Sequence, residues 1–204
     1  TDFGILDHSI KRALERKRLN DERKRYLEQV NQINEIISML NRGKSTEEIF
    51  ESLNTTLQKI IPYKSLSLMI ININTGEVTP KLIVSQSESL INSNSVFSVD
   101  DIMLENISAN KSVLSIEDIN ASRDSYPGSE MIRSLIHSGV RSLIVLPLIM
   151  KDAIRGFLLF TSDKVGSFIT GHISFLESIG GQISFSVERA ELIEKIEKHT
   201  KNLE

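Results

Sequence analysis

The sequence predicts an α/β (α+β) fold: a mostly antiparallel sheet of about six strands with helices packed on it, and a long helix at each end of the chain. Two observations predict the sheet domain: strand-like apolar segments alternate with short helical ones, and residues 141–161 follow the order strand, two-residue turn, strand. A third predicts the flanking helices, because apolar residues recur at seven-residue spacing near both ends. We expect the domain at residues 45–188, between an N-terminal helical segment at 1–44 and a helix at 189–204 that continues toward an output domain.

Residues 5–41 are predicted to form one long helix. Apolar side chains along it follow the a/d pattern of a two-stranded coiled coil, at Leu19, Tyr26, Val30, Ile33, Ile37 and Leu40. Basic residues are frequent between positions 11 and 25, but the acidic residues among them at helical spacing favour a solvated face over a nucleic-acid contact. This seam predicts that the chain pairs with itself as a parallel homodimer.

Capping and stop signals predict four more helices, at residues 45–62, 101–110, 130–138 and from about 171 to beyond 199. Ser45 with Glu48 forms a capping box at the start of the first of these helices. The last helix continues the dimer seam at Leu192 and Ile196. The seam is weaker there because Arg189 takes an a position and His199 a d position.

Five strands are predicted between these helices, at residues 65–73, 78–86, 112–119, 141–150 and 153–161. Asn74-Thr75-Gly76 turns the first strand into the second, and the polar turn Lys151-Asp152 joins the last two. Residues 85–98 are rich in serine and asparagine and are therefore predicted to be a loop. Hairpin pairing of this kind indicates a mostly antiparallel sheet.

Composition excludes several kinds of chemistry. The chain has no cysteine, which rules out disulfides, thiolate metal ligands and cysteine nucleophiles on it and fits a cytoplasmic location. Its net charge of −3 gives no general attraction to nucleic acid or membrane, and no segment approaches the ~20 apolar residues that span a bilayer. We expect neither enzymatic activity nor a metal site. The sequence contains no motif for a nucleophile with its base, for a phosphate-binding loop or for a pair of metal ligands.

The ordered set of motifs resembles a GAF domain, a sensory module of signal-transduction proteins, over about residues 45–190. The motifs that carry this resemblance are Gly139-Val140-Arg141-Ser142, Pro147-Leu148, Gly156-Phe157-Leu158 and Phe168. Residues 6–18 resemble the last helix of a response-regulator receiver domain. Together the two resemblances imply a fragment of an intracellular two-component-type protein, with a receiver domain upstream and an output domain downstream.

The resemblance implies a regulatory module that binds a small molecule or relays an upstream state through dimeric flanking helices. Two alternatives are a structural dimerisation module without a ligand and, less favoured by the residues, a small enzyme on the same fold. A ligand would lie between the sheet and residues 120–138, where Arg123, Tyr126, Met131 and His137 are the candidate binding residues. In the opposing interpretation Met131, Ile132 and Leu135 fill this space.

The resemblance also bears on the cofactor. Cyclic-nucleotide-binding relatives carry an Asn-Lys, Phe and Asp-Glu motif. Here Asp163-Lys164 and Phe168 stand at its first positions, but His172 and Ile173 replace the acidic pair. The lysine–carboxylate pair of that motif is lost, although Asp163 could partner His172, and this departure disfavours a cyclic nucleotide. The absence of cysteine excludes a covalently attached bilin and the cysteine-dependent methionine sulfoxide reduction of other relatives.

Overall fold

The structure is a computed structural model that describes residues 15–18, 24, 30, 31, 33–42, 45–85, 92 and 94–201. The chain divides into two compact units, Thr1–Ser38 and Met39–Glu204. Every described residue of the first unit is helical, as the sequence predicts. The second unit contains the sheet domain.

The sheet has six strands in the order β3-β2-β1-β6-β5-β4, and every neighbouring pair is antiparallel. Strand β1 pairs with β6 at its centre, with Leu68 opposite Leu158. The first and last hairpins of the domain are thereby joined into one sheet. The strands are β1 Ser65–Ile71, β2 Glu77–Ser85, β3 Phe97–Ser98, β4 Leu114–Ile116, β5 Ser142–Met150 and β6 Ala153–Ser162. This arrangement confirms the predicted sheet.

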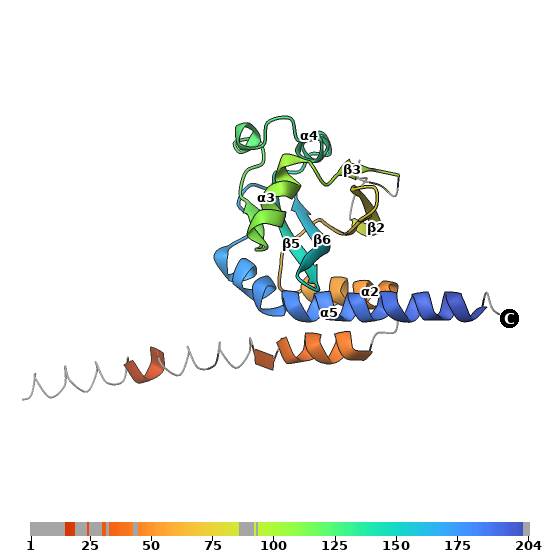
Figure 1. Cartoon of the computed structure of the whole chain (residues 1–204). Coiled ribbons are helices and arrows are strands. Elements are labelled where there is room, and N and C mark those ends of the chain that lie inside the picture. The colour runs from red at the N-terminus through yellow and green to blue at the C-terminus, as the bar shows by residue number, and fades with distance from the viewer. Residues whose placement is uncertain are drawn as a thin grey trace, which may run out of the picture. The chain divides into compact units, whose positions relative to one another are not determined.

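Helices cover both faces of the sheet (Figure 1). Helices α2 Thr46–Leu57 and α5 Thr170–Lys201 lie along one face, and α3 Ile102–Asn110 and α4 Glu130–His137 lie over the other. The 3₁₀ turn η1 Arg123–Ser125 precedes α4. Side chains of β5 alternate between the faces: Leu143 and Val145 join the core under α3 and α4, while Leu146 meets α5.

Glycine permits two close approaches in this packing. In α5 a Cβ on Gly180 would lie 2.9 Å from Cδ1 of Leu146, so the missing side chain lets the helix settle onto β5. In β6 a Cβ on Gly156 would collide with the backbone oxygen of Met69 on the neighbouring strand. Gly180 thus permits the close packing of α5 on β5.

The two edge strands differ from the prediction. Strand β4 has three residues where eight are predicted, because the chain leaves the ladder after Ile116 and Asp118 accepts a hydrogen bond from the N–H of Asn120 in a local turn. Strand β3, within the predicted loop, pairs only Phe97 and Ser98 with β2. A strand of two residues is too short to show a period of two in the sequence.

Candidate functional site

The face where a ligand is predicted holds a densely packed apolar core. We call it the core cluster: Met69, Val78, Phe97, Met103, Leu104, Ile107, Ile116, Ile119, Met131, Ile132, Leu135, Val140, Leu143, Val145, Phe157 and Leu159. Met131, Ile132 and Leu135 of α4 are each at most 1% exposed. The space between α4 and the sheet is therefore occupied by these three side chains, in the arrangement expected when no ligand is bound there.

The four candidate ligand residues are not gathered around one surface. Met131 is buried in the core cluster, and Tyr126 is half-buried against it. Burial also raises the pKa of the Tyr126 hydroxyl. Arg123 and His137 are exposed at η1 and at the end of α4. His137 lines a surface hollow of about 490 Å³ between β3 and α4. A ligand role for these residues stays a prediction.

One carboxylate caps both helices on this face. Asp101 accepts hydrogen bonds from the N–H of Met103 at 3.0 Å, the first turn of α3, and from the N–H of Met131 at 3.2 Å, the first turn of α4. It also accepts from the buried hydroxyl of Ser129 at 2.7 Å, and this hydroxyl accepts from the N–H of Ile132 at 3.1 Å. Helix N-termini attract anions, and here Asp101 already fills that place for both helices.

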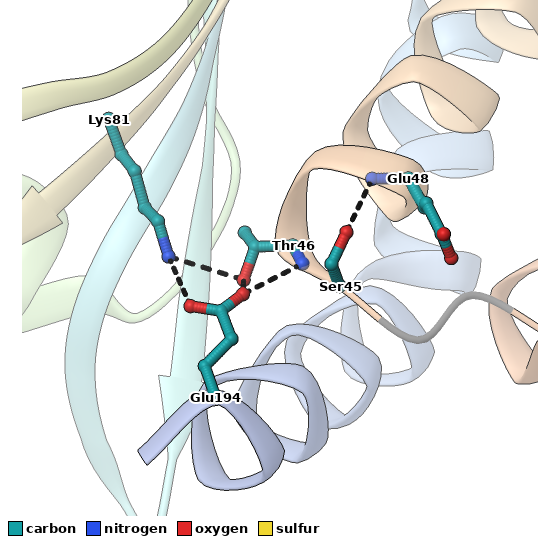
Figure 2. A network of polar contacts seen from close by, with 5 residues as sticks. All are labelled: Ser45, Thr46, Glu48, Lys81 and Glu194. Carbon is teal, nitrogen blue, oxygen red and sulfur yellow. Dashed lines mark hydrogen bonds and ion pairs between the residues drawn. The ribbon is translucent and has the colours of Figure 1, made fainter. Parts of the chain in front are cut away.

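The opposite face has a second polar network, which joins α5 to the start of α2 (Figure 2). The carboxylate of Glu194 accepts hydrogen bonds from the N–H of Thr46 at 3.1 Å and from its hydroxyl at 2.9 Å. Lys81 of β2 lies 3.4 Å from the other oxygen of Glu194 and donates to the Thr46 hydroxyl at 3.2 Å. We call Thr46, Lys81 and Glu194 the latch, because they hold the second half of α5 against the domain.

The latch stabilises the charged form of Glu194. Partial burial raises the pKa of this carboxyl group, but the hydrogen bonds from Thr46 and the charge of Lys81 outweigh that effect and hold the pKa below its ordinary value. The carboxylate also lies at the N-terminus of α2, where the helix dipole favours negative charge. Ser45 caps the same turn by accepting from the N–H of Glu48 at 3.2 Å, which confirms the predicted cap.

Arg189 makes a further connection from α5. Its guanidinium donates to the carbonyl oxygens of Leu40 at 3.0 Å and Asn41 at 3.2 Å, and Gln182 donates to the side chain of Asn41 at 3.3 Å. Carbonyl groups in the last turn of a helix lack intrahelical partners and favour cations. The structure thus explains the arginine at an a position: its charge is used within the chain, near the end of the helical segment 33–42.

The predicted dimer seam is only partly exposed. Leu40 is fully buried within its own chain, and Val30, Ile33 and Ile37 are half-buried. In α5, Leu192 and Ile196 are 51% and 65% exposed, and Phe185 one heptad before Leu192 is 58% exposed. We call Phe185, Leu192 and Ile196 the apolar stripe. Leu19 and Tyr26 are not among the described residues.

The segment before α5 corrects one expectation. Asp163 forms an ion pair with Lys64 at 2.8 Å and not with His172. The hydrogen bond from Lys64 lowers the pKa of this carboxyl group. The Nδ1 atom of His172 instead accepts from the N–H of Ile169 at 3.3 Å, at the start of α5, and burial lowers the pKa of its imidazole. His172 stands where the cyclic-nucleotide motif has an acidic residue, and it acts here as a neutral cap at the start of α5.

The residues that the structure describes contain neither a cluster of metal ligands nor a membrane-spanning helix. In these ranges no three His, Asp or Glu side chains lie close enough together to hold a metal ion. None of the described helices combines the length and the apolar character needed to cross a membrane.

Solved structures share this fold, although no family model matches the chain and no curated protein is similar to it in sequence. The GAF domain of a phosphoenolpyruvate-protein phosphotransferase from Acinetobacter has a TM-score of 0.64 at 11% identity. The match covers 82% of this chain and 97% of that domain. Free methionine-R-sulfoxide reductase from Neisseria meningitidis has a TM-score of 0.62 at 14% identity, and the match covers 78% of this chain and 88% of the reductase chain. The chromophore-binding domain of a bacteriophytochrome from R. palustris has a TM-score of 0.66 at 9% identity, and the match covers 83% of this chain and 63% of the bacteriophytochrome chain.

These neighbours confirm the predicted fold class, which is that of GAF domains. At such low identity they show the fold alone. The stretch that resembles a receiver helix, residues 6–18, falls mostly outside the described ranges and stays a prediction. The structure also shows that α5 crosses the expected domain boundary after residue 188 without a break.

Proposed function

We propose that this chain is a regulatory module of a cytoplasmic, two-component-type signalling protein, and that it passes its state onward through α5. One observation carries the proposal: α5 is a single helix of 32 residues with two different environments. Its first half packs on the sheet through Gly180, and from Phe185 onward it carries the exposed apolar stripe. Because a helix transmits displacement along its axis, a change in the domain reaches the end of α5.

The latch is the proposed point of control. With Glu194 bound to Thr46 and Lys81, the second half of α5 is held against α2 and β2. With the latch open, this half is free to take another position. A ligand or an upstream domain that prefers one state shifts the population between the two, by as much as its affinities for the states differ.

The partner of the apolar stripe in this proposal is a second copy of the same helix. Phe185, Leu192 and Ile196 are spaced by seven and four residues, the spacing of a coiled-coil seam. Parallel pairing would place the C-terminal ends of two copies side by side, as an output domain downstream requires. An upstream receiver domain would act through the N-terminal helix.

A specific observation favours a second candidate, a structural dimerisation module without a ligand. The predicted ligand face is filled by the core cluster, and Asp101 takes the place of an anion at α3 and α4. No catalytic role is part of either proposal. One structural neighbour is named as a methionine sulfoxide reductase, so the fold also occurs in an enzyme, and the lack of enzymatic activity stays a prediction.

Native mass spectrometry of the freshly purified chain tests the proposal. We expect a dimer, and we expect Leu192→Asp together with Ile196→Asp to make it monomeric, because both changes place like charges in the seam. Val165→Asp is the matched control, since Val165 is 51% exposed like Leu192 but lies outside α5. A dimer that survives the double substitution would exclude pairing through α5. An additional small mass on the wild-type dimer would favour the ligand-binding module over the structural one.

A further inference from the structure

A hollow of about 560 Å³ lies on the α5 side of the sheet, on the opposite face from the core cluster. Its walls come from the end of β1, the β1–β2 turn, β2, the β5–β6 hairpin and the second half of α5. Met150, which is 5% exposed, and the half-buried Ile70 supply its apolar lining, and Arg155, Glu188, Glu191 and Glu194 are half-buried as well. Sites for small molecules typically measure about 300–1,000 Å³ and combine an apolar surface with a few polar groups.

The rim of this hollow is rich in basic side chains. Its lining includes the five basic residues Lys81, Lys151, Arg155, Lys195 and Lys198 and the three acidic residues Glu188, Glu191 and Glu194. Lys81 and Glu194 pair with each other in the latch. Among the described residues, the other four bases form no ion pair. A surplus of unpaired bases in a chain with net charge −3 indicates a site for an anion.

The bases approach from two sides. Lys151 and Arg155 come from the β5–β6 hairpin, and Lys195 and Lys198 lie one turn apart on α5. Lys151 also has a left-handed backbone with φ of 49°, at a turn position where glycine or asparagine is usual. Lys111 steadies this turn by donating to the carbonyl oxygen of Asp152 at 2.7 Å. A lysine is thus held at a conformationally unfavourable position on the rim of the hollow.

We propose that the hollow binds a small organic polyphosphate, such as a nucleoside polyphosphate. Its phosphate groups would bridge the bases of the hairpin and of α5, with Arg155 offering the planar fork that suits phosphate oxygens. Its apolar body would lie on Ile70 and Met150. A singly charged anion is a poor fit, because only a ligand with several charges can engage both sets of bases.

This site deepens the proposed function but does not depend on helix pairing. A ligand that bridges the hairpin and α5 would hold the helix in its latched position. It would also lie beside the apolar stripe, because Leu192 lines the hollow as well. Ligand binding and dimerisation are measured separately, so either proposal can be refuted while the other holds.

Isothermal titration calorimetry of the full chain with ATP in the absence of divalent metal tests the site. Tripolyphosphate tests the phosphate groups of the ligand alone, and adenosine tests its nucleoside alone. We expect ATP to bind one per chain, tripolyphosphate to bind more weakly and adenosine to give no signal. Lys195→Gln with Lys198→Gln, and separately Lys151→Gln with Arg155→Gln, should each weaken ATP binding about tenfold or more, since each removes two charge-assisted contacts. Lys59→Gln with Lys164→Gln removes the same charge from exposed positions outside the hollow and should change the affinity by less than about twofold.

Three results would overturn the proposal. The first is no ATP binding up to millimolar concentration at about 0.1 M salt, where exposed charges are screened beyond roughly 10 Å. The second is an equal loss of affinity in the control variant, which would assign the binding to diffuse charge. The third is an ATP footprint on α3 and α4 in amide chemical shifts, which would place the ligand on the other face. Circular dichroism of each variant confirms that it is folded.

Discussion

Glu194 caps a helix that begins 148 residues before it: its carboxylate accepts a hydrogen bond from the backbone N–H of Thr46, the first residue of α2. The side chain is 28% exposed, so solvent partly screens the pair. Through this contact the position of α5 is coupled to the integrity of α2. Any signal that leaves the domain along α5 must keep or break this bond.

Replacing Glu194 by Ala should loosen the second half of α5. The loss of a partly exposed cap lowers the free energy of unfolding by about 1 kcal/mol. Urea unfolding measures the loss, and amide hydrogen exchange should become faster in residues 190–201. Glu177→Ala, an exposed glutamate in the first half of the same helix, is the control and should change stability by less than about 0.5 kcal/mol. Equal effects of the two substitutions would show that the latch does not hold α5.

The stability that the latch provides should decrease in acid. The pKa of Glu194 lies below its ordinary value of 4.5 in the folded chain. A carboxyl group of this kind contributes stability above its unfolded pKa and loses that contribution as the pH falls through its folded pKa. The difference in unfolding free energy between wild type and Glu194→Gln should therefore be constant near neutral pH and shrink below about pH 4.5. A difference that grows on acidification would contradict the latch.

His172 should make the start of α5 sensitive to mild acid. Burial lowers the pKa of His172 from its ordinary value of 6.5, and its neutral Nδ1 accepts the hydrogen bond from Ile169. The stability from this group is present above the unfolded pKa and is lost as the pH falls through the folded pKa, because a protonated Nδ1 cannot accept.

The comparison of His172→Asp with wild type isolates this effect. Aspartate at the third residue of a helix still accepts from the N–H of Ile169 at about pH 5 and favours the helix dipole. Between about pH 7 and pH 5 the melting temperature of wild type should therefore fall more than that of the variant. His199→Asp, at an exposed position late in α5, should behave like wild type. Parallel pH profiles for wild type and His172→Asp would exclude the cap as a pH-sensitive element.

Asp101→Ala should destabilise α3 and α4 together. The substitution removes caps from both helices, and each cap contributes about 0.5–2 kcal/mol. Hydrogen exchange should accelerate in both helices, whereas Asp100→Ala, one residue earlier and exposed, should affect neither. Asp101→Asn retains an acceptor oxygen, so its hydrogen-exchange rates in α3 and α4 should lie between those of Asp101→Ala and Asp100→Ala. Faster exchange confined to α3 would show that Ser129 alone suffices to cap α4.

Local signals account for most of the fold that was predicted from the sequence. The cap at Ser45, the turn at Lys151 and Asp152 and the apolar runs of β5 and β6 each act over a few residues, and the structure contains all of them. The edge strands were predicted poorly. Strand β3 is too short to show a period, and the predicted length of β4 ignored the turn at Asp118.

The candidate site was predicted less well because its contacts join distant parts of the chain. A sequence pattern identifies Asp101 and Ser129 as caps of separate helices, but only the packing of α3 beside α4 lets one carboxylate serve both. Similarly, Arg189 looks like a defect in a coiled-coil seam until the fold brings it to the carbonyl group of Leu40.

The sequence by itself determined the order and type of the elements, because capping, turn formation and apolar periodicity depend on neighbouring residues. Only the tertiary structure decided which faces are filled and which charges meet. The antiparallel order β3-β2-β1-β6-β5-β4 and the helices laid on it bring Lys81 and Thr46 to Glu194 and turn Met131 into the core. Such contacts depend on distance in space, which residue spacing along the chain does not encode.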